Sequence, residues 1–357
     1  MTQFDLLLVG HGNVAKRLVS LLAEREDALA RDYGLRARVV GVATRRHGQA
    51  YATGGVNASA MNAPVVSTLE FLRRALAQSA AAAKAGRLVV IETTTLDIER
   101  GEPAASHIRA ALAGGAHVVT ANKGPVAFAY RRLAQAARRV NRRFLFEGAV
   151  MDGVPIFNLV RETLPAVRIL GFRGVVNSTT NFILTAMEQG LRFEDALAEM
   201  QRRGIAEADA SLDIDGWDAA AKTAALANVL MDADITPKNV ERRGIGPDTR
   251  RLAREAKAAG RRLKLVAQAE RDGRGVRARV APEDLPGDDL LAGLEGQQNA
   301  LILKTDLLEE IAIVQRSGSL TQTAYALLSD LVTVARSVRV EPARRRSPAA
   351  TRRRRIP

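Results

Sequence analysis

Short apolar runs and amphipathic segments alternate over roughly the first 145 residues of the chain. Runs in which nearly every residue is apolar predict buried strands, whereas apolar residues three and four positions apart predict helices. The predicted strands are 4–10, 37–43, 88–95, 117–120 and 144–147, and the predicted helices are 15–26, 64–85, 104–113 and 126–139. This alternation favours the α/β class, with a doubly wound parallel sheet.

A glycine turn joins the first predicted strand to the first helix. Residues 10–15 read Gly-His-Gly-Asn-Val-Ala. Gly10 permits a tight turn, Gly12 lets the backbone approach a pyrophosphate, and Ala15 lets helix and strand pack closely. Free N–H groups at the helix start can hold phosphates. The turn predicts a Rossmann-like dinucleotide-binding domain, with Asn13 and Val14 beside the two glycines at the cofactor.

Polar residues follow the other strands of this predicted sheet. In such sheets a ligand lies at the carboxyl ends of the strands, so Thr93, Thr94 and Lys123 are expected at the rim that holds the glycine turn. After the second strand come Arg45 and Arg46, with no acid. An acid there binds the ribose of NAD, whereas arginine suits the 2′-phosphate of NADP. We therefore expect NADP as cofactor, with NAD possible and surface charges as the alternative reading.

The pattern changes at the glycine- and proline-containing connection of residues 147–156. Beyond it, a strand at 167–176 leads through the polar run 177–181 to helices at 182–189, 193–203 and 218–231. Within residues 250–315, the alternating segments 262–269, 277–280, 299–304 and 311–315 predict the strands of an open sheet, and a last helix reaches about residue 335. We predict a dinucleotide-binding domain at 1–147, an α+β substrate-binding and dimerisation domain at 148–315, a returning helix within 316–340 and a disordered tail at 341–357.

Composition limits the kinds of protein that this sequence can be. The 357 residues are 47% apolar, which is ordinary for a globular protein. Because no apolar run is long enough to cross a bilayer and the N-terminus lacks a signal-peptide pattern, we expect a cytoplasmic protein. No cysteine is present, which excludes thiolate metal sites and cysteine nucleophiles. Half of the net charge of +14 comes from seven arginines in the tail, which we interpret as solvated.

An acidic cluster stands out in this basic chain. Five carboxylates lie between Glu207 and Asp218, and like charges repel unless a cation offsets them. Lys222 follows Asp218 by one helical turn, the orientation that favours an ion pair. At a surface such a pair contributes only a few tenths of a kcal/mol. The neighbours of Lys222 are nearly all alanine, however, which favours a closely packed helix face.

A calcium loop is one reading of this cluster. Ser211, Asp213, Asp215 and Gly216 match the first positions of an EF-hand, but Lys222 then occupies the place of the bidentate glutamate, so we reject that reading. The remaining interpretation is that the carboxylates hold a cationic group while Lys222 serves an oxygen. A substrate with an ammonium group and a reducible carbonyl fits, since a lysine near a nicotinamide can protonate the alkoxide formed by hydride transfer.

Five segments together resemble the homoserine dehydrogenase family in order and spacing. They are residues 10–15, 120–123, 147–155, 174–181 and 204–222, and the resemblance covers about residues 4–335. It implies the NAD(P)(H)-dependent interconversion of L-aspartate 4-semialdehyde and L-homoserine, on the route to threonine, methionine and isoleucine. The chain is similar to the monofunctional short form of the family, for which no C-terminal regulatory domain is expected.

The resemblance also implies residue roles. Lys222 is the implied proton donor, Lys123 lies between nicotinamide and substrate, and Asp218 completes the catalytic group. The implied substrate-binding residues are Gly204, Glu207, Asp213, Asp218, Asn177 and Thr179. The backbone carbonyls of Glu147, Val150, Asp152 and Val154 match a monovalent cation site, usually Na+. A homodimer built through the second domain is expected.

Three departures from the family pattern are present. Ala210 replaces a usual proline, Ser178 replaces a usual glycine, and residues 315–319 replace a glycine-rich loop that closes over the cofactor. Gly318 is therefore expected at the cofactor, and cofactor affinity is where we expect differences from the family.

Two alternative functions were weighed against this one. An aspartate-semialdehyde dehydrogenase shares the substrate but requires a cysteine, which the chain lacks. A non-catalytic NADP-binding sensor, or a nucleic-acid-associated protein that uses the arginine tail, is the alternative from another class. The presence of both Lys123 and Lys222 argues against an inactive protein.

Overall fold

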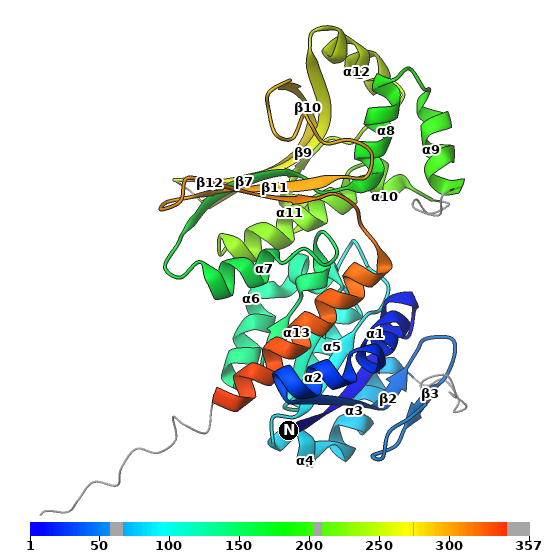
Figure 1. Cartoon of the computed structure of the whole chain (residues 1–357), viewed down its shortest axis with the longest axis vertical. Helices are drawn as coiled ribbons and strands as arrows, with labels where there is room; N and C mark the ends of the chain where they lie inside the picture. The colour runs from blue at the N-terminus through cyan, green and yellow to red at the C-terminus, as the bar shows by residue number, and fades with distance from the viewer. Residues whose placement is uncertain (58–66, 203–208, 274, 341–357) are drawn as a thin grey trace, which may run out of the picture.

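The structure is a computed structural model that describes residues 1–57, 67–202, 209–273 and 275–340. The predicted arginine-rich tail lies outside these residues. Two six-stranded sheets form the centres of two bodies, the lower and the upper in Figure 1. We call them the first and second domains. No helix in the described part of the chain is both long and apolar enough to cross a membrane.

The first sheet has the strand order β3-β2-β1-β4-β5-β6. Its strands are β1 (Thr2–Val9), β2 (Leu35–Ala43), β3 (Gln49–Tyr51), β4 (Leu88–Glu92), β5 (His117–Thr120) and β6 (Phe144–Leu145). All neighbours pair in parallel except the short edge strand β3, which runs antiparallel to β2. This parallel pairing confirms the predicted doubly wound sheet. Strands that are apolar on both sides, as these are, need helices on both faces of the sheet.

Helices from both ends of the chain cover this sheet. They are α1 (Asn13–Glu24), α2 (Glu26–Tyr33), α3 (Thr68–Gln78), α4 (Ala80–Lys84), α5 (Ala104–Ala113), α6 (Lys123–Arg139) and, from the C-terminal part, α13 (Leu320–Val340). Leu327 and Leu331 of α13 are fully buried in one cluster with Leu6 and Leu8 of β1. The last helix therefore crosses back to complete the first domain, and it continues five residues beyond its predicted end.

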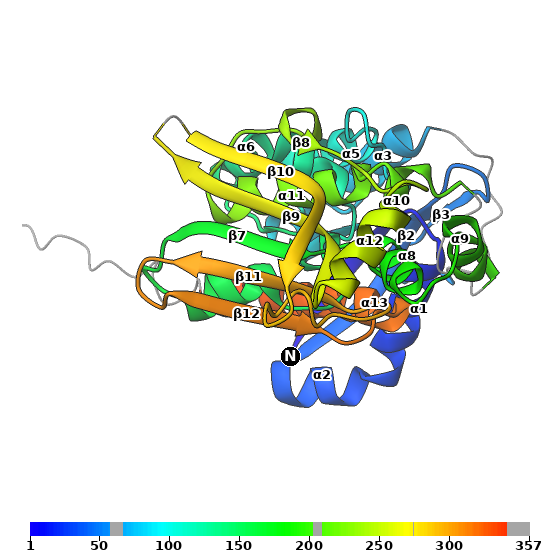
Figure 2. The same ribbon diagram turned by 90° about the horizontal axis from the view of Figure 1, so that it is seen from above.

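The second sheet has the order β12-β11-β7-β9-β10-β8. Its strands are β7 (Ile169–Val175), β8 (Glu241–Arg242), β9 (Arg261–Asp272), β10 (Gly275–Pro286), β11 (Asn299–Thr305) and β12 (Glu310–Gln315). Figure 2 looks onto this sheet, with β10, β9, β7, β11 and β12 side by side. The predicted open sheet is confirmed, and its pairing is antiparallel except between β8 and β10.

The four strands predicted within residues 250–315 correspond to β9, β10, β11 and β12, and the segment before them is helical. Residues Thr249–Ala258 form helix α12. Ala253 and Ala256 are buried, and Leu252 packs beside them, so the apolar positions recur at helical and not at strand spacing. The alternation that predicts strands holds from β9 onward.

The second domain also contains five further helices among the described residues. They are α7 (Ile156–Asn158), α8 (Ser178–Glu188), α9 (Phe193–Arg202), α10 (Ser211–Ile214) and α11 (Trp217–Leu230). Helix α11 lies between the sheet and helix α6 of the first domain (Figure 1). Its alanines at 219–221, 224, 225 and 227 are buried, and such small side chains allow close approach on both sides. Asn228 of α11 also donates to the carbonyls of Val126 and Ala127 in α6.

Candidate functional site

A cavity of about 430 Å³ lies at the carboxyl end of the first sheet, beside the glycine turn. Seven of the expected cofactor residues line it: Gly10, Gly12, Asn13, Arg45, Arg46, Thr93 and Thr94. Val14 is not on its wall and instead packs, partly buried, against the cluster shared with α13. Three further residues at its wall, Lys16, Thr44 and His107, were missed by sequence reasoning.

Glycine is required at the start of this turn. Gly10 has φ of +93°, and a Cβ there would lie 2.7 Å from the carbonyl oxygen of Thr93. The Thr93 hydroxyl in turn donates to the carbonyl of Gly10 at 3.2 Å. Helix α1 then begins after Gly12 without any side-chain cap. Its first N–H groups therefore remain available to an anion such as a phosphate.

The charge on the cavity wall is positive. Lys16, Arg45 and Arg46 all line it, and no carboxylate lies among the described lining residues. Burial, together with nearby Lys16, lowers the pKa of His11, and burial lowers the pKa of His107 to about 4. Both imidazoles are therefore neutral near pH 7. The cationic side chains of Lys16, Arg45 and Arg46, together with the free N–H groups of α1, therefore favour an anionic ligand.

A buried carboxylate organises the rim beside this cavity. Glu92, at the end of β4, is fully buried and accepts from the Thr94 backbone N–H at 2.9 Å and from the Thr120 hydroxyl at 2.8 Å. Burial raises the pKa of Glu92 in spite of these bonds. Asn122 donates to the Thr94 carbonyl at 3.1 Å and caps α6 by accepting from the N–H of Gly124. This network fixes the start of α6, which carries Lys123. In the sequence, the only sign of Glu92's role was that a glutamate ends an otherwise apolar strand.

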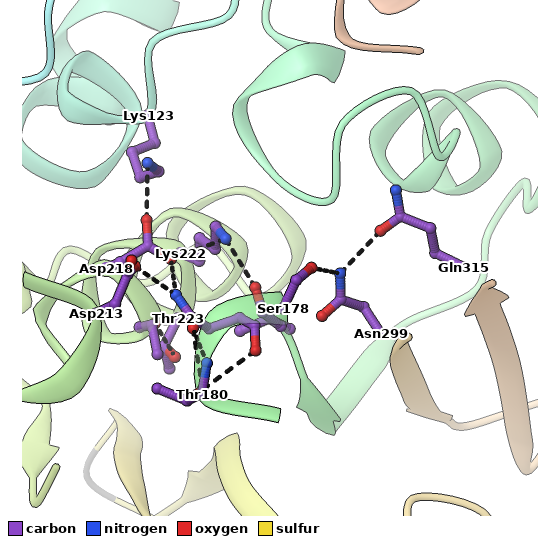
Figure 3. A network of polar contacts seen from close by, with 12 residues as sticks. Lys123, Ser178, Thr180, Asp213, Asp218, Lys222, Thr223, Asn299 and Gln315 are labelled. Carbon is purple, nitrogen blue, oxygen red and sulfur yellow. Dashed lines mark hydrogen bonds and ion pairs between the residues drawn. The ribbon is translucent and has the colours of Figure 1, made fainter. Parts of the chain in front are cut away.

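Asp218 joins the two lysines that the sequence singled out (Figure 3). One carboxylate oxygen lies 2.9 Å from Nζ of Lys123 on α6, and the other lies 2.8 Å from Nζ of Lys222 on α11. Lys222 also donates to the Val176 carbonyl at 2.7 Å. The two lysines come from different domains, so this ion-pair bridge exists only when the domains are docked.

In this bridge burial is the largest single influence on each pKa, but the charged and hydrogen-bonding partners together outweigh it. Burial alone would raise the pKa of Asp218, but Lys123 and Lys222 outweigh it and hold that pKa well below the usual range. Burial alone would lower the pKa of Lys222, but Asp218, helped by the nearby charges of Asp213 and Asp152, outweighs it and the pKa is raised. At neutral pH the site therefore holds a carboxylate and a Lys222 that carries its proton.

Asn177 holds two of the acidic residues together. Its amide nitrogen donates to Asp213 Oδ1 at 2.7 Å and to Asp218 Oδ2 at 2.8 Å. Its amide oxygen accepts from the backbone N–H and the hydroxyl of Thr180, at 2.8 and 3.0 Å. Every donor and acceptor of the amide is thus engaged within the protein. Burial and Asp218 raise the pKa of Asp213, while Asn177 and Thr179 bond to it and oppose that rise.

The other predicted site residues make no direct contact with the bridge or fall outside the described residues. Gly204 and Glu207 fall outside the described residues. Glu147, Val150, Asp152 and Val154 lie on the connection between β6 and α7. Gly318 does not line the cofactor cavity; it packs against the carboxylate of Asp152.

Comparison with known proteins agrees with this geometry. Residues 10–147 match the family model described as homoserine dehydrogenase, NAD binding domain, and residues 155–332 match the model described as homoserine dehydrogenase. The chain is 35% identical over 348 residues to an NAD(+)-dependent homoserine dehydrogenase of Pseudomonas canavaninivorans, covering 94% of this chain and 97% of that protein. It is also 35% identical over 351 residues to a homoserine dehydrogenase of Methanocaldococcus jannaschii, covering 94% and 99%.

Solved structures extend the likeness to the fold. A crystal structure of a homoserine dehydrogenase from Thiobacillus denitrificans superposes with a TM-score of 0.80 and 32% identity, covering 97% of this chain and 76% of that one. The sequence matches cover both the first domain, which holds the cavity, and the second domain, which the ion-pair bridge joins to it. The chain belongs to the homoserine dehydrogenase family of NAD(P)-dependent oxidoreductases that act on a CH–OH group.

Proposed function

We propose that this chain catalyses the reversible reduction of L-aspartate 4-semialdehyde to L-homoserine, a step toward threonine, methionine and isoleucine. The observation that carries this proposal is the bridge Lys123–Asp218–Lys222, set beside an anion-binding cavity at the rim of the first sheet. A nicotinamide cofactor in that cavity supplies or accepts the hydride. The family membership supports the same reaction.

The residues of the bridge divide the work. Lys222 carries a proton at neutral pH and gives it to the substrate oxygen that becomes the alcohol, and it takes that proton back in the reverse direction. Lys123 stands opposite it on the first domain and orients the same oxygen. Asp218 offsets both charges, which lets two lysines approach one small site without mutual repulsion. The acidic residues nearby, Asp213 among them, suit the ammonium group of an amino-acid substrate.

NADP is the proposed cofactor, with NAD as the second possibility. Arg45 and Arg46 follow β2, where the adenosine ribose lies in this fold, and Lys16 adds a third cation to the same wall. No carboxylate on the described wall would repel a 2′-phosphate or bind a free ribose diol. The P. canavaninivorans relative is named as NAD(+)-dependent, so the two cofactors need direct comparison.

A monovalent cation, Na+ by analogy with the family, fits the connection between the domains. Met151 and Asp152 both adopt a φ of 53°, which curls the backbone there. Among the described residues, no hydrogen bond reaches the carbonyls of Val150 and Asp152. Carbonyl oxygens that accept no hydrogen bond are suitable ligands for a hard cation. With Glu147 and Val154, they are the residues that would hold the ion.

We also propose a cytoplasmic homodimer formed through the second domain. The domain division that fits these roles is 1–147 for the cofactor, 148–315 for substrate and dimerisation, and 316–340 for the returning helix. The proposed alternatives, a non-catalytic sensor or a nucleic-acid-associated protein, gain no support from the matched proteins.

A single assay tests the activity. The purified chain, with Na+ or K+ present, is expected to reduce NADP⁺ and NAD⁺ in the presence of L-homoserine, with a higher kcat/KM for NADP⁺. The absence of turnover with either cofactor between pH 7 and 10 would refute the proposed function.

A further inference from the structure

Two connections link the domains, and the structure joins them to each other. The first follows β6 and contains Asp152; the second follows β12 and leads from Gln315 into α13. The Gln315 side-chain nitrogen donates to Asp152 Oδ2 at 3.0 Å and to Gln322 Oε1 at 3.1 Å. Thr323 of α13 donates to the other Asp152 oxygen at 3.1 Å. Asp152 is therefore held from both sides of the second connection.

Further hydrogen bonds connect Gln315 to the second domain through the side chains of Asn299 and Ser178. Asn299, at the start of β11, donates to Gln315 Oε1 at 3.0 Å and to the Ser178 hydroxyl oxygen at 2.8 Å (Figure 3). Asn299 and Gln315 are 3% and 4% exposed, so water does not replace these bonds. Ser178 is the first residue of α8 and the direct neighbour of Asn177.

The carboxylate of Asp152 sets which atom donates and which accepts in this series of hydrogen bonds. An ionised carboxylate only accepts, so Gln315 must turn its nitrogen toward Asp152 and its oxygen toward Asn299. Asn299 must then present its nitrogen to Gln315 and to Ser178. A residue without both a donor and an acceptor at position 315 cannot join the two ends. Two departures from the family pattern, at 178 and in 315–319, are thus one connected feature.

We propose that Gln315 is a positioning residue, which clamps the two interdomain connections and, through Asn299 and Ser178, holds the first turn of α8. That turn carries Asn177, whose amide sets the places of Asp213 and Asp218. Asp218 must meet Lys123 across the domain boundary. The clamp therefore acts on the bridge without touching a ligand. This inference rests on the proposed dehydrogenase activity.

The test compares Gln315→Ala, Gln315→Glu and Ser178→Ala with the unaltered chain. Gln315→Glu keeps the size of the side chain but places a second carboxylate against Asp152. All three variants are expected to lower kcat for homoserine oxidation by between about tenfold and a hundredfold, because small misplacements of reacting groups cost that much. Calorimetric Kd values for NADP⁺ are expected to stay within about twofold. Gln189→Ala, an exposed glutamine at the end of α8, is the matched control.

The double variant Gln315→Ala with Ser178→Ala decides whether the relay acts as a unit. Its loss of kcat is expected to be close to that of one single variant, since independent sites would instead multiply. Multiplicative losses would refute the relay, and a lower Tm with unchanged kcat in the single variants would refute the positioning role. If Gln315→Ala does not fold, Ser178→Ala and Gln315→Glu carry the same comparison. An inactive unaltered chain would refute the proposed function instead.

Discussion

The two halves of the site are built by different means. In the cofactor half, glycine backbone, an uncapped helix start and permanently charged side chains make the binding surface, and most of its residues follow their strands directly in the chain. In the catalytic half, Asp218 gains its properties from Lys123 and Lys222 and from the amide of Asn177. The first half is local in origin, whereas the second depends on the docking of two domains.

The strongest way to sharpen this contrast is to remove the proton donor. Lys222→Ala is expected to lower kcat by roughly a thousandfold, within the range for general acids, while the Kd of NADP⁺ changes little. Stopped-flow hydride transfer and calorimetry measure the two effects. Lys238→Ala, an exposed lysine in the same domain, serves as control. Near-normal kcat in Lys222→Ala would show that the proton comes from elsewhere.

The amide that holds the acids gives the next effect. Asn177→Asp keeps the shape but replaces both donors with a third carboxylate next to Asp213 and Asp218. Repulsion is expected to move Asp218 away from the lysines and to lower kcat about a hundredfold. Steady-state kinetics check this. If kcat is kept and only the KM for homoserine rises, Asn177 contacts the substrate as the family resemblance implied.

The next prediction concerns cofactor affinity and tests the arginines of the cofactor half. Replacing Arg45 and Arg46 with alanine is expected to raise the Kd of NADP⁺ by roughly tenfold to a hundredfold, the worth of one charged hydrogen bond, and to change the Kd of NAD⁺ little. Arg36→Ala, exposed on β2, is the control. Equal changes for both cofactors would contradict a 2′-phosphate site at these residues.

The last prediction concerns the pH dependence of stability and not catalysis, and it is made at Asp330 of α13. Asp330 accepts from the backbone N–H of Glu147, and burial raises its pKa to about 6. Because the folded-state value is raised, its contribution to stability is complete below about pH 4 and is lost as pH rises to about 6. Asp330→Asn cannot ionise. Relative to the unaltered chain, it is expected to gain on the order of 3 kcal/mol between pH 4 and 7.

Urea unfolding across this pH range measures the difference. The stability of Asp330→Asn is expected to keep part of its pH dependence, because Glu147, whose pKa burial and Asp330 raise to about 7, still titrates in the variant. That dependence is expected to be shallower than in the unaltered chain. Parallel stability curves for the two proteins would show that Asp330 is ionised in the folded state throughout the range.

Sequence reasoning succeeded where the physics is local. The glycine turn, the apolar strands and the Asp218–Lys222 spacing could be predicted because each depends on neighbours a few residues away. Helix α12 was not predicted, because its buried alanines are too small to mark a helix clearly by hydrophobic period. Glu92, Lys16 and Gln315 could not be assigned, since a lone polar residue acquires its role only from partners that are distant in the chain.

By itself the sequence determined a nucleotide-binding first domain, an open-sheet second domain and the identities of the two lysines. Backbone geometry and apolar periodicity are encoded within single segments, which is why these features are readable in order. Only the tertiary structure decided that Asp218 spans both lysines, that Asn177 links Asp213 to Asp218, and that Gln315 reaches Ser178 through Asn299. Such contacts join residues that the chain separates, and their charges and hydrogen bonds take effect only when burial brings them within about 3 Å.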